Sequence, residues 1–326
     1  MRALVTGGAG YIGSHLVRHL VDEGAHAVVL DDLSTGFADA VDRRARFVEG
    51  DIRDPALVRS VIEAERVDAV FHFAARIRVD ESVKDPAKYY RDNVAASLAL
   101  FDAILSGPAR VVVLSSTAAV YGDPDPGVAA LGEDHPKRPL NAYGESKLVL
   151  EGALARYGQA YGLRWAALRY FNAAGAHEDG SLRERHEPET HLVPIALEAA
   201  AGERTALTVF GRDYPTSDGT CVRDYVHVMD LATAHVAAAR HLAAGRPGGA
   251  FNLGTGRGSS VAEVIACVER VTGRALPVVD AARRPGDASV LVASAERAER
   301  ELGWRPTRDL DAIVRDAWRA RRPRAL

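Results

Sequence analysis

Short apolar, β-branched runs alternate with longer helical patterns through the first half of the chain. The runs fall at residues 3–5, 27–30, 47–48, 69–73, 111–114 and 165–168, and each is short enough to be a buried strand. Strands of this kind, separated by helical patterns, form parallel sheets whose crossover helices cover both faces. We therefore predict an α/β fold with a doubly wound parallel sheet.

The pattern changes after about residue 171. A polar, irregular stretch runs to Glu189, and a glycine-bounded loop at 211–219 interrupts shorter elements. We predict a first domain at 1–172 and a smaller mixed α/β lobe at 173–326. The helical pattern at 228–242 can pack back onto the first domain, so a return segment is expected near 225–254. The lobe should close over the carboxyl ends of the strands, where ligands bind in such sheets.

Composition narrows the class of protein. The chain has 326 residues, 47% of them hydrophobic, and a formal charge of -3, so it can form a large core but has no broad basic surface for nucleic acid or membrane. Cys221 and Cys267 are far apart, which fits a reducing compartment. The chain shows neither an export signal nor a membrane-length apolar run, so we expect a cytoplasmic protein.

A glycine-rich motif follows the first predicted strand. Residues 6–13 read Thr-Gly-Gly-Ala-Gly-Tyr-Ile-Gly, and a helix is expected from about Tyr11. Glycines let the backbone approach a pyrophosphate, which the positive helix end then stabilises. Asp31 ends the second strand, where a carboxylate can accept from ribose hydroxyls. Asp31 and Asp32 would repel a 2'-phosphate, so NAD is predicted over NADP.

Two further strand ends point to the same edge of the sheet. Asp51 and Ile52 follow the third strand, and Phe73, Ala74 and Ala75 follow the fourth. Asp51 is a candidate adenine contact, and the alternative is a turn or helix-capping aspartate.

Lys147 lies four positions after Tyr143, a spacing that places both side chains on one helix face. Of ten tyrosines, only this one has a lysine at that spacing. Lowering a phenol pKa from about 10 to about 7 requires about 4 kcal/mol. An ammonium about 4 Å away supplies up to about that energy. The pair is therefore a candidate acid and base, and the alternative is a solvated surface pair.

Together with Ser115-Ser116-Thr117, these motifs resemble the extended short-chain dehydrogenase/reductase superfamily. The segments at 169–177, 211–227 and 283–287 resemble, more narrowly, the UDP-glucose 4-epimerases. The resemblance implies a Rossmann domain with bound NAD. The cofactor contacts expected from motif and resemblance are Gly7, Gly10, Tyr11, Ile12, Gly13, Asp31, Asp32, Asp51, Ile52, Phe73, Ala74, Ala75, Asn93, Tyr143, Lys147 and Phe171.

The resemblance also implies a reaction. The Tyr143 phenolate takes the sugar 4-hydroxyl proton while the C4 hydride passes to NAD, and the 4-keto sugar turns over and takes the hydride back on its other face. Thr117 would help bind the hydroxyl, or would only cap local backbone. Lys147 would bind the nicotinamide ribose and lower the tyrosine pKa. The expected catalytic residues are Thr117, Tyr143 and Lys147.

The same resemblance implies a UDP-sugar substrate, with UDP-galactose and UDP-glucose first. The expected substrate contacts are Thr117, Tyr143, Asn172, His191, Val209, Phe210, Arg223, Arg284, Asp287 and Leu291. Leu291 takes the position that gates the sugar C2 substituent, so some tolerance of N-acetylated sugars is expected. Relatives pair through helices matching 93–105 and 143–157, which predicts a homodimer, although the apolar residues there could belong to the internal core.

Three other functions compete with this one. A nucleotide-sugar dehydratase needs proton-transfer groups where this chain has Ala118 and Ala119. An epimerase of UDP-N-acetylglucosamine or UDP-glucuronate remains open, whereas a non-catalytic NAD sensor would not need the Tyr143 and Lys147 pair. His72 is expected to be a hydrogen-bonded core residue. The other histidines form no metal-like grouping with carboxylates or thiols, so no metal site is predicted.

Overall fold

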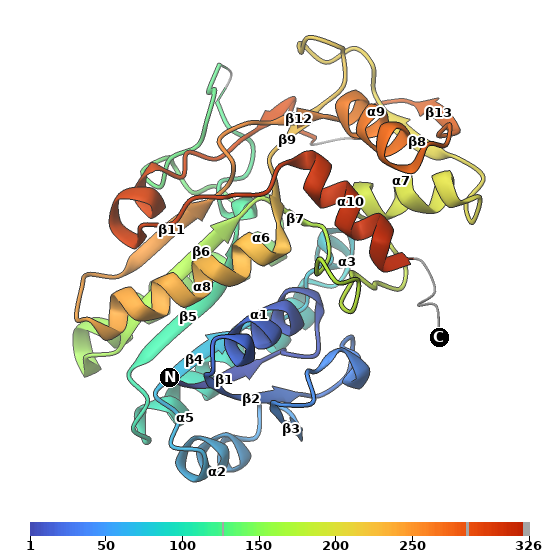
Figure 1. Cartoon of the computed structure of the whole chain (residues 1–326). Coiled ribbons are helices and arrows are strands. Elements are labelled where there is room, and N and C mark those ends of the chain that lie inside the picture. Colours follow the sequence, from blue (N-terminus) through green and yellow to red (C-terminus); the bar gives the residue numbers. More distant parts are fainter. Residues whose placement is uncertain (126, 285–286, 322–326) are drawn as a thin grey trace.

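The protein is described here by a computed structural model that covers residues 1–125, 127–284 and 287–321 (Figure 1). Within those ranges the main sheet has seven strands in the order β11-β6-β5-β4-β1-β2-β3, and every neighbouring pair is parallel. Its strands are β1 (Arg2–Thr6), β2 (His26–Asp31), β3 (Arg46–Glu49), β4 (Ala69–His72), β5 (Val111–Thr117), β6 (Arg164–Tyr170) and β11 (Gly249–Leu253). The predicted doubly wound α/β fold is confirmed.

Helices cover both faces of this sheet (Figure 1). On one face, α1 (Tyr11–Asp22) and α8 (Val228–Ala243) contribute Leu16, Leu20 and Leu231 to a core that includes Val5 of β1. The opposite face carries α2 (Pro55–Ala64), α5 (Ala96–Leu105) and α6 (Ala142–Tyr161), packed over a second apolar cluster. Alternate residues of β1 enter the two clusters because successive side chains of a strand point to opposite faces.

A smaller group of elements lies beyond the carboxyl ends of the strands. Helices α7 (Leu192–Ala201), α9 (Val261–Thr272) and α10 (Leu310–Arg321) share a third apolar cluster. The short strands are β7 (Asn172–Ala174), β8 (Leu207–Phe210), β9 (Val222–Arg223), β10 (Tyr225–His227), β12 (Ser259–Ser260), β13 (Val278–Ala281) and β14 (Val290–Leu291). β8 pairs with β13, β10 with β7, and β9 lies between β12 and β14.

Short helical segments complete the chain. They are η1 (Ala38–Ala40), α3 (Val79–Lys84), α4 (Pro86–Tyr89), η2 (Tyr90–Ala95), η3 (Ala118–Val120) and η4 (Ala298–Leu302). η2 continues directly into α5, and η3 follows the end of β5. Among the described residues, none of the helices combines the length and apolar character required to cross a membrane.

The six strands expected from the sequence all form and join one sheet. The seventh, β11, was not predicted as a strand, although it falls within the expected return segment at 225–254. That segment also contains α8, which packs beside α1 on the main sheet. The domain limits at 172 and 173 stay a prediction.

Candidate functional site

The turn between β1 and α1 brings glycine backbone close to the loop after β4. Gly7 has a φ of +73°, and a Cβ on it would lie 2.5 Å from the Ala74 amide nitrogen. A side chain on Gly13 would clash with the Gly7 carbonyl. Gly10 is the N-cap of α1 and supplies no side-chain cap, so the first amides of the helix remain available to an anion. This part of the site fits a dinucleotide pyrophosphate.

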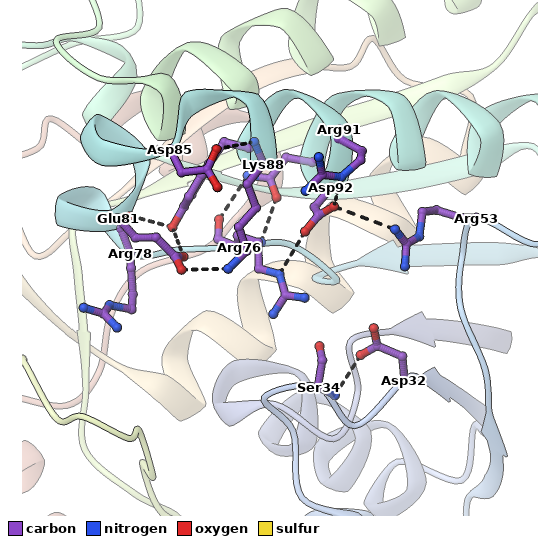
Figure 2. Close-up of polar contacts among 12 residues, drawn as sticks. Asp32, Ser34, Arg53, Arg76, Arg78, Glu81, Asp85, Lys88, Arg91 and Asp92 are labelled. Atoms are coloured by element: carbon purple, nitrogen blue, oxygen red, sulfur yellow. Dashed lines mark hydrogen bonds and ion pairs between the residues drawn. The ribbon is translucent and has the colours of Figure 1, made fainter.

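Asp31 and Asp32 lie where β2 ends. The Asp31 carboxylate accepts hydrogen bonds from the amides of Ala9 and Leu33, both at 2.9 Å. Burial raises the pKa of Asp31, while these two amides oppose the rise. Asp32 accepts from the Ser34 amide at 2.9 Å (Figure 2). Asp31 therefore ties the glycine-rich turn to β2 and leaves a negative pair at the predicted ribose position.

Figure 2 shows Arg53, Arg76 and Arg91 gathered around Asp92, across from Asp32. Their nitrogens lie 3.8, 3.3 and 3.2 Å from the Asp92 carboxylate. Arg53 also donates to Asp51, whose carboxylate accepts from the Arg53 amide at 2.8 Å. Asp51 therefore stabilises a turn, which was the alternative to its role as an adenine contact. The contact with adenine stays a prediction.

Asn93 is buried in η2 and fastens the loop after β4. Its side chain accepts from the Arg76 amide at 2.7 Å and donates to the Arg76 carbonyl at 3.0 Å and to Ser146 Oγ at 3.1 Å. Phe73 and Ala74 follow β4, and both donate their amides to the Thr6 carbonyl. Asn93 thus positions the expected nicotinamide-side loop against α6. Direct contact of Asn93 with a cofactor stays a prediction.

Tyr143 and Lys147 lie in the first turns of α6, which Asn141 caps by accepting from the Gly144 amide at 2.9 Å. Lys147 is only 1% exposed, so the surface-pair alternative is wrong. Burial lowers the pKa of Lys147 to about 8. Burial also raises the pKa of Tyr143, and the adjacent Thr117 side chain works in the opposite direction.

The pKa of Tyr143 corrects an expectation from the sequence. Lys147 was expected to lower it, but the desolvation of the phenol dominates and raises it. Burial acts on both groups at once and disfavours the charged form of each. The Thr117 side chain is the group that opposes this rise in the pKa of Tyr143.

Thr117 ends β5, and its Oγ1 accepts from the Ala119 amide at 3.1 Å. The backbone-capping alternative is therefore realised in the structure. It does not exclude a second partner, because a hydroxyl has one donor and two acceptor positions.

A buried polar network behind Thr117 was missed from the sequence. Ser116 donates to Glu151 at 2.6 Å, and the Arg169 guanidinium forks onto the same carboxylate, with Nε at 2.9 Å. Arg169 also donates to the Tyr121 hydroxyl at 2.9 Å. The network joins β5, β6 and α6, and Glu151 lies about one helix turn after Lys147. One signal in the sequence pointed to this network: Glu151 lies four positions after Lys147, which places both side chains on the same face of the helix.

His72 is a core residue, as expected. Its two ring nitrogens lie 2.7 Å from Thr6 Oγ1 and 2.7 Å from Ser97 Oγ. Burial, with a smaller effect of the charge on Lys147, lowers the pKa of His72 to about 3. His72 therefore connects β1, β4 and α5 as a neutral ring.

Several expected substrate residues come together beyond the sheet. The Asp287 carboxylate lies 3.0 Å from Arg284 Nε and 3.5 Å from Arg223 Nη2. The Arg284 guanidinium covers the Phe210 ring at 4.6 Å, and Leu291 pairs in register with Arg223. Val209, the residue before Phe210 in β8, is buried. Residues 285 and 286 of the motif at 283–287 lie outside the described residues.

The remaining expected residues are more dispersed. Asn172 begins β7 and donates its amide to the Asp224 carbonyl at 3.0 Å. Phe171 packs with Leu291 against a small apolar cluster under η3. Ile52 is buried at the end of β3 in the second core. Cys221 and Cys267 are both buried and unpaired.

His191 is part of a grouping of histidines and carboxylates that was not expected from the sequence. Its Nδ1 lies 2.6 Å from Glu184 Oε1, and one ligand-type atom from each of Glu184, His186, Glu189 and His191 lies within 4.8 Å of the others. The statement that the histidines form no grouping with carboxylates is therefore wrong. The signal was visible as Glu-x-His-x-x-Glu-x-His at 184–191.

The carboxylates also change the protonation of both rings. Burial by itself lowers the pKa of His191 and of His186, but Glu184 and Glu189 outweigh it and raise the values to about 10 and about 9.

The glycine turn, the strand-end carboxylates and the Tyr143 and Lys147 pair define a nucleotide-dependent enzyme of the dehydrogenase/reductase type. The family model described as "NAD dependent epimerase/dehydratase family" matches residues 3–254, and the chain belongs to this family.

Within the family, similar curated proteins are UDP-glucose 4-epimerases, which confirms the resemblance seen in the motifs. The one from Lacticaseibacillus casei is 49% identical over 319 residues, covering 98% of this chain and 96% of the relative. The one from Azospirillum brasilense is 50% identical, covering 97% of this chain and 90% of the relative.

The similar solved structures are also 4-epimerases of UDP-sugars. The UDP-glucose 4-epimerase from Brucella ovis in complex with NAD has a TM-score of 0.94 and 50% identity, with 97% of each chain covered. The UDP-Glc/GlcNAc 4-epimerase from Campylobacter jejuni has a TM-score of 0.85 and 40% identity, also with 97% of each chain covered.

Proposed function

We propose that this protein is an NAD-dependent UDP-glucose 4-epimerase, which interconverts UDP-galactose and UDP-glucose by inverting the configuration at C4. The observation that carries the proposal is the placement of Tyr143 and Lys147 on α6 beside Thr117 at the end of β5. Identities of 49% and 50% to curated UDP-glucose 4-epimerases, over nearly the whole chain, support this choice of substrate.

The three residues divide the proton chemistry. The Tyr143 phenolate takes the proton of the C4 hydroxyl and, as the phenol, later returns it, and Thr117 Oγ1 orients that hydroxyl. Lys147 holds a positive charge near the phenol and binds ribose hydroxyls, which replace some of the hydration that its burial removes. NAD, when bound, supplies the hydride acceptor and donor for C4.

NAD is held by the first βα turn and the ends of β2, β3 and β4. Amides at the start of α1 meet the pyrophosphate, and Asp31 and Asp32 favour a free 2'-hydroxyl over a 2'-phosphate. The loop that Asn93 fastens lies on the nicotinamide side. The remaining proposed contacts are Gly7, Gly10, Tyr11, Ile12, Gly13, Asp51, Ile52, Phe73, Ala74, Ala75 and Phe171.

The UDP-sugar is held by residues beyond the sheet. Arg223 and Arg284 share Asp287 as a partner, so both guanidiniums lie near one place where a diphosphate could bind. Phe210 lies under Arg284 and offers an aromatic face. The other proposed contacts are Asn172, His191, Val209 and Leu291. We assign 1–172 and the return segment at 225–254 to the cofactor domain, and the rest of 173–326 to this lobe.

Incubation of the purified protein with UDP-galactose, without added cofactor, tests the function. UDP-glucose should form, and deuterium placed on C4 should stay on C4 in ordinary water, because a hydride returns there and not a solvent proton. A keto-deoxy sugar would indicate a dehydratase, which the side chains of Ala118 and Ala119 argue against. A protein that binds NAD but converts no nucleotide sugar would be a sensor, and the proposal would be wrong.

We also propose a homodimer formed through α6 and the η2–α5 segment. Val149 of α6, Leu140 before it and Tyr90 of η2 are large hydrophobic side chains with 43%, 62% and 39% exposure. Light scattering on the purified protein should give twice the chain mass. The unpaired cysteines fit a reducing compartment, so we propose a cytoplasmic location.

A further inference from the structure

The loop between β7 and α7 places four metal-ligand side chains together. Glu184, His186 and Glu189 belong to the loop, and His191 is the residue before α7. The Glu184 and Glu189 side chains are only 6% and 8% exposed.

Three of the four histidine–carboxylate separations in this cluster are close to the edge of a coordination tetrahedron, and the fourth, from Glu184 to His191, is shorter. Glu184 Oε1 lies 3.2 Å from His186 Nδ1 and 2.6 Å from His191 Nδ1. Glu189 oxygens lie 3.7 and 3.4 Å from the same two nitrogens. A tetrahedral zinc ion with bonds of about 2.0–2.1 Å separates its ligands by about 3.3 Å. The observed separations scatter around that value.

In the part of the chain that the structure describes, some ligand-type atoms of this cluster have no hydrogen-bond partner, whereas Glu189 Oε1 accepts from the amides of Thr190 and His191 at 2.8 and 2.9 Å. Within the described residues, Glu184 Oε1 and His186 Nδ1 are buried and have no partner in hydrogen-bond geometry. In a simple ion-pair network, each imidazole N–H would point at a carboxylate oxygen and donate to it. Here the atoms are close enough, but Glu184 Oε1 receives no such bond.

We propose that Glu184, His186, Glu189 and His191 form a binding site for one divalent transition-metal ion, and that zinc is the ion it fits best. Two imidazole nitrogens and two carboxylate oxygens suit zinc. Calcium and magnesium take oxygen ligands, so a site that is half imidazole disfavours them.

The surroundings indicate what the ion would do. Arg185, inside the loop, pairs with Asp39 at 2.7 Å and covers the Phe37 ring at 4.0 Å. The His186 ring lies 6.3 Å from the ring of Tyr11, which begins α1. An ion here would fasten the loop at the start of both α1 and α7. The ion would therefore hold this loop in place, and because His191 is also a proposed substrate contact, zinc binding is measured without a nucleotide sugar.

Direct metal binding tests the proposal. Tag-free protein is stripped with a chelator, dialysed and titrated with zinc chloride by calorimetry, and bound zinc is counted by atomic emission. One zinc ion per chain should bind with submicromolar affinity and raise the Tm. His186→Ala should weaken binding by about 100-fold or more, and Glu184→Gln should also weaken it.

Two controls keep the result interpretable. His19→Ala removes a histidine that lies 3.7 Å from a glutamate, Glu23, in a simple surface pair, and it should bind zinc like the wild type. Cobalt added to wild-type protein needs no variant and should give the visible absorption of a tetrahedral site. Binding below one equivalent, equal affinity in folded His186→Ala, or no tetrahedral cobalt spectrum would each overturn the proposal.

Discussion

The two halves of the proposed site are built in different ways. At the sheet edge, Tyr143 and Lys147 are set by the first turns of a long helix, and burial disfavours the charge on both. Beyond the sheet, Arg223 and Arg284 come from short strands and loops and already share the carboxylate of Asp287. In the first half, burial makes the charged forms of Tyr143 and Lys147 electrostatically unfavourable. In the second half, the charges of Arg223 and Arg284 are already paired with a carboxylate.

This difference predicts different consequences of substitution. A buried ammonium whose pKa is lowered by desolvation costs folding energy, and a ligand can relieve that cost. Paired arginines must exchange one anionic partner for another, which affects binding more than chemistry. Substitutions at the sheet edge should therefore change turnover and stability, and those beyond the sheet should change KM.

Tyr143→Phe should give the largest effect. Loss of the phenol hydroxyl removes the group that moves the C4 proton, so kcat should fall by about 10³-fold or more. Bound NAD should remain, since the ring still fills its place; cofactor content and kcat are measured on the same preparation. Tyr161→Phe, on an exposed tyrosine of the same helix, should keep wild-type turnover. If kcat falls by less than tenfold, Tyr143 is not the acid and base.

Glu151→Ala should cause the largest loss of stability. It removes the carboxylate that Arg169 and Ser116 share and leaves the Arg169 guanidinium, only 4% exposed, without its charge partner. Breaking such a buried pair costs about 3–5 kcal/mol. Urea unfolding measures the change, and Glu145→Ala, which removes an exposed carboxylate bonded to Tyr90, should cost less than about 1 kcal/mol. Equal losses in the two variants would contradict a special role of the buried pair.

Lys147→Met should stabilise the cofactor-free protein while abolishing turnover. Burial lowers the pKa of Lys147 from 10.5 to about 8, so at neutral pH its charge destabilises the folded state by at most about 3 kcal/mol. The folded chain loses this proton near pH 8, while the unfolded chain keeps it up to its ordinary value. The penalty is therefore complete below pH 8 and disappears as the pH rises toward 10.5.

Urea unfolding of both proteins at pH 7 and near pH 10 measures this sign. The stability advantage of Lys147→Met should be largest at pH 7 and should shrink at the higher pH. An advantage that grows with pH would show that the lysine charge is favourable in the folded state.

The sequence predicted the sheet edge better than the region beyond it. The apolar runs predicted six strands because a buried parallel strand appears in the sequence as a short run of apolar residues. The four-residue spacing predicted the Tyr143 and Lys147 pair because helix geometry depends only on residues close in sequence. The pairing of Glu151 with Arg169 was missed, since it depends on how α6 packs on β6. The pKa of Tyr143 was misjudged for the same reason, because burial is a property of the whole fold.

The loop at 184–191 shows a different limit. Its histidines and glutamates were present in plain sequence, but no helix or strand fixes their spacing. Only the path of the chain before α7 brings the four side chains within 4.8 Å. The periodic spacing of a helix or a strand therefore does not reveal such a group.

Arg284→Ala should raise KM for UDP-galactose by about tenfold and change kcat by less than about threefold. Arg284 is 58% exposed and contacts Phe210 and Asp287, so its removal should leave the fold intact and remove one diphosphate contact. Arg223→Ala should act in the same direction. Arg212→Ala, which removes an exposed arginine paired with Asp280, should leave KM unchanged. An unchanged KM in Arg284→Ala would remove that residue from the site.

Leu291→Tyr should give the smallest effect and should concern choice of sugar. Leu291 lies in β14 in register with Arg223, and it packs against the same small apolar cluster as Phe171. If it gates the C2 substituent, the wild type should convert UDP-N-acetylglucosamine as well as UDP-glucose, and tyrosine should occupy the volume of the N-acetyl group. The ratio of the two kcat/KM values should then shift by about tenfold toward UDP-glucose. Leu291→Met, of similar volume, should keep the wild-type ratio. If tyrosine lowers both values equally, residue 291 supports the fold of this lobe and does not select the sugar.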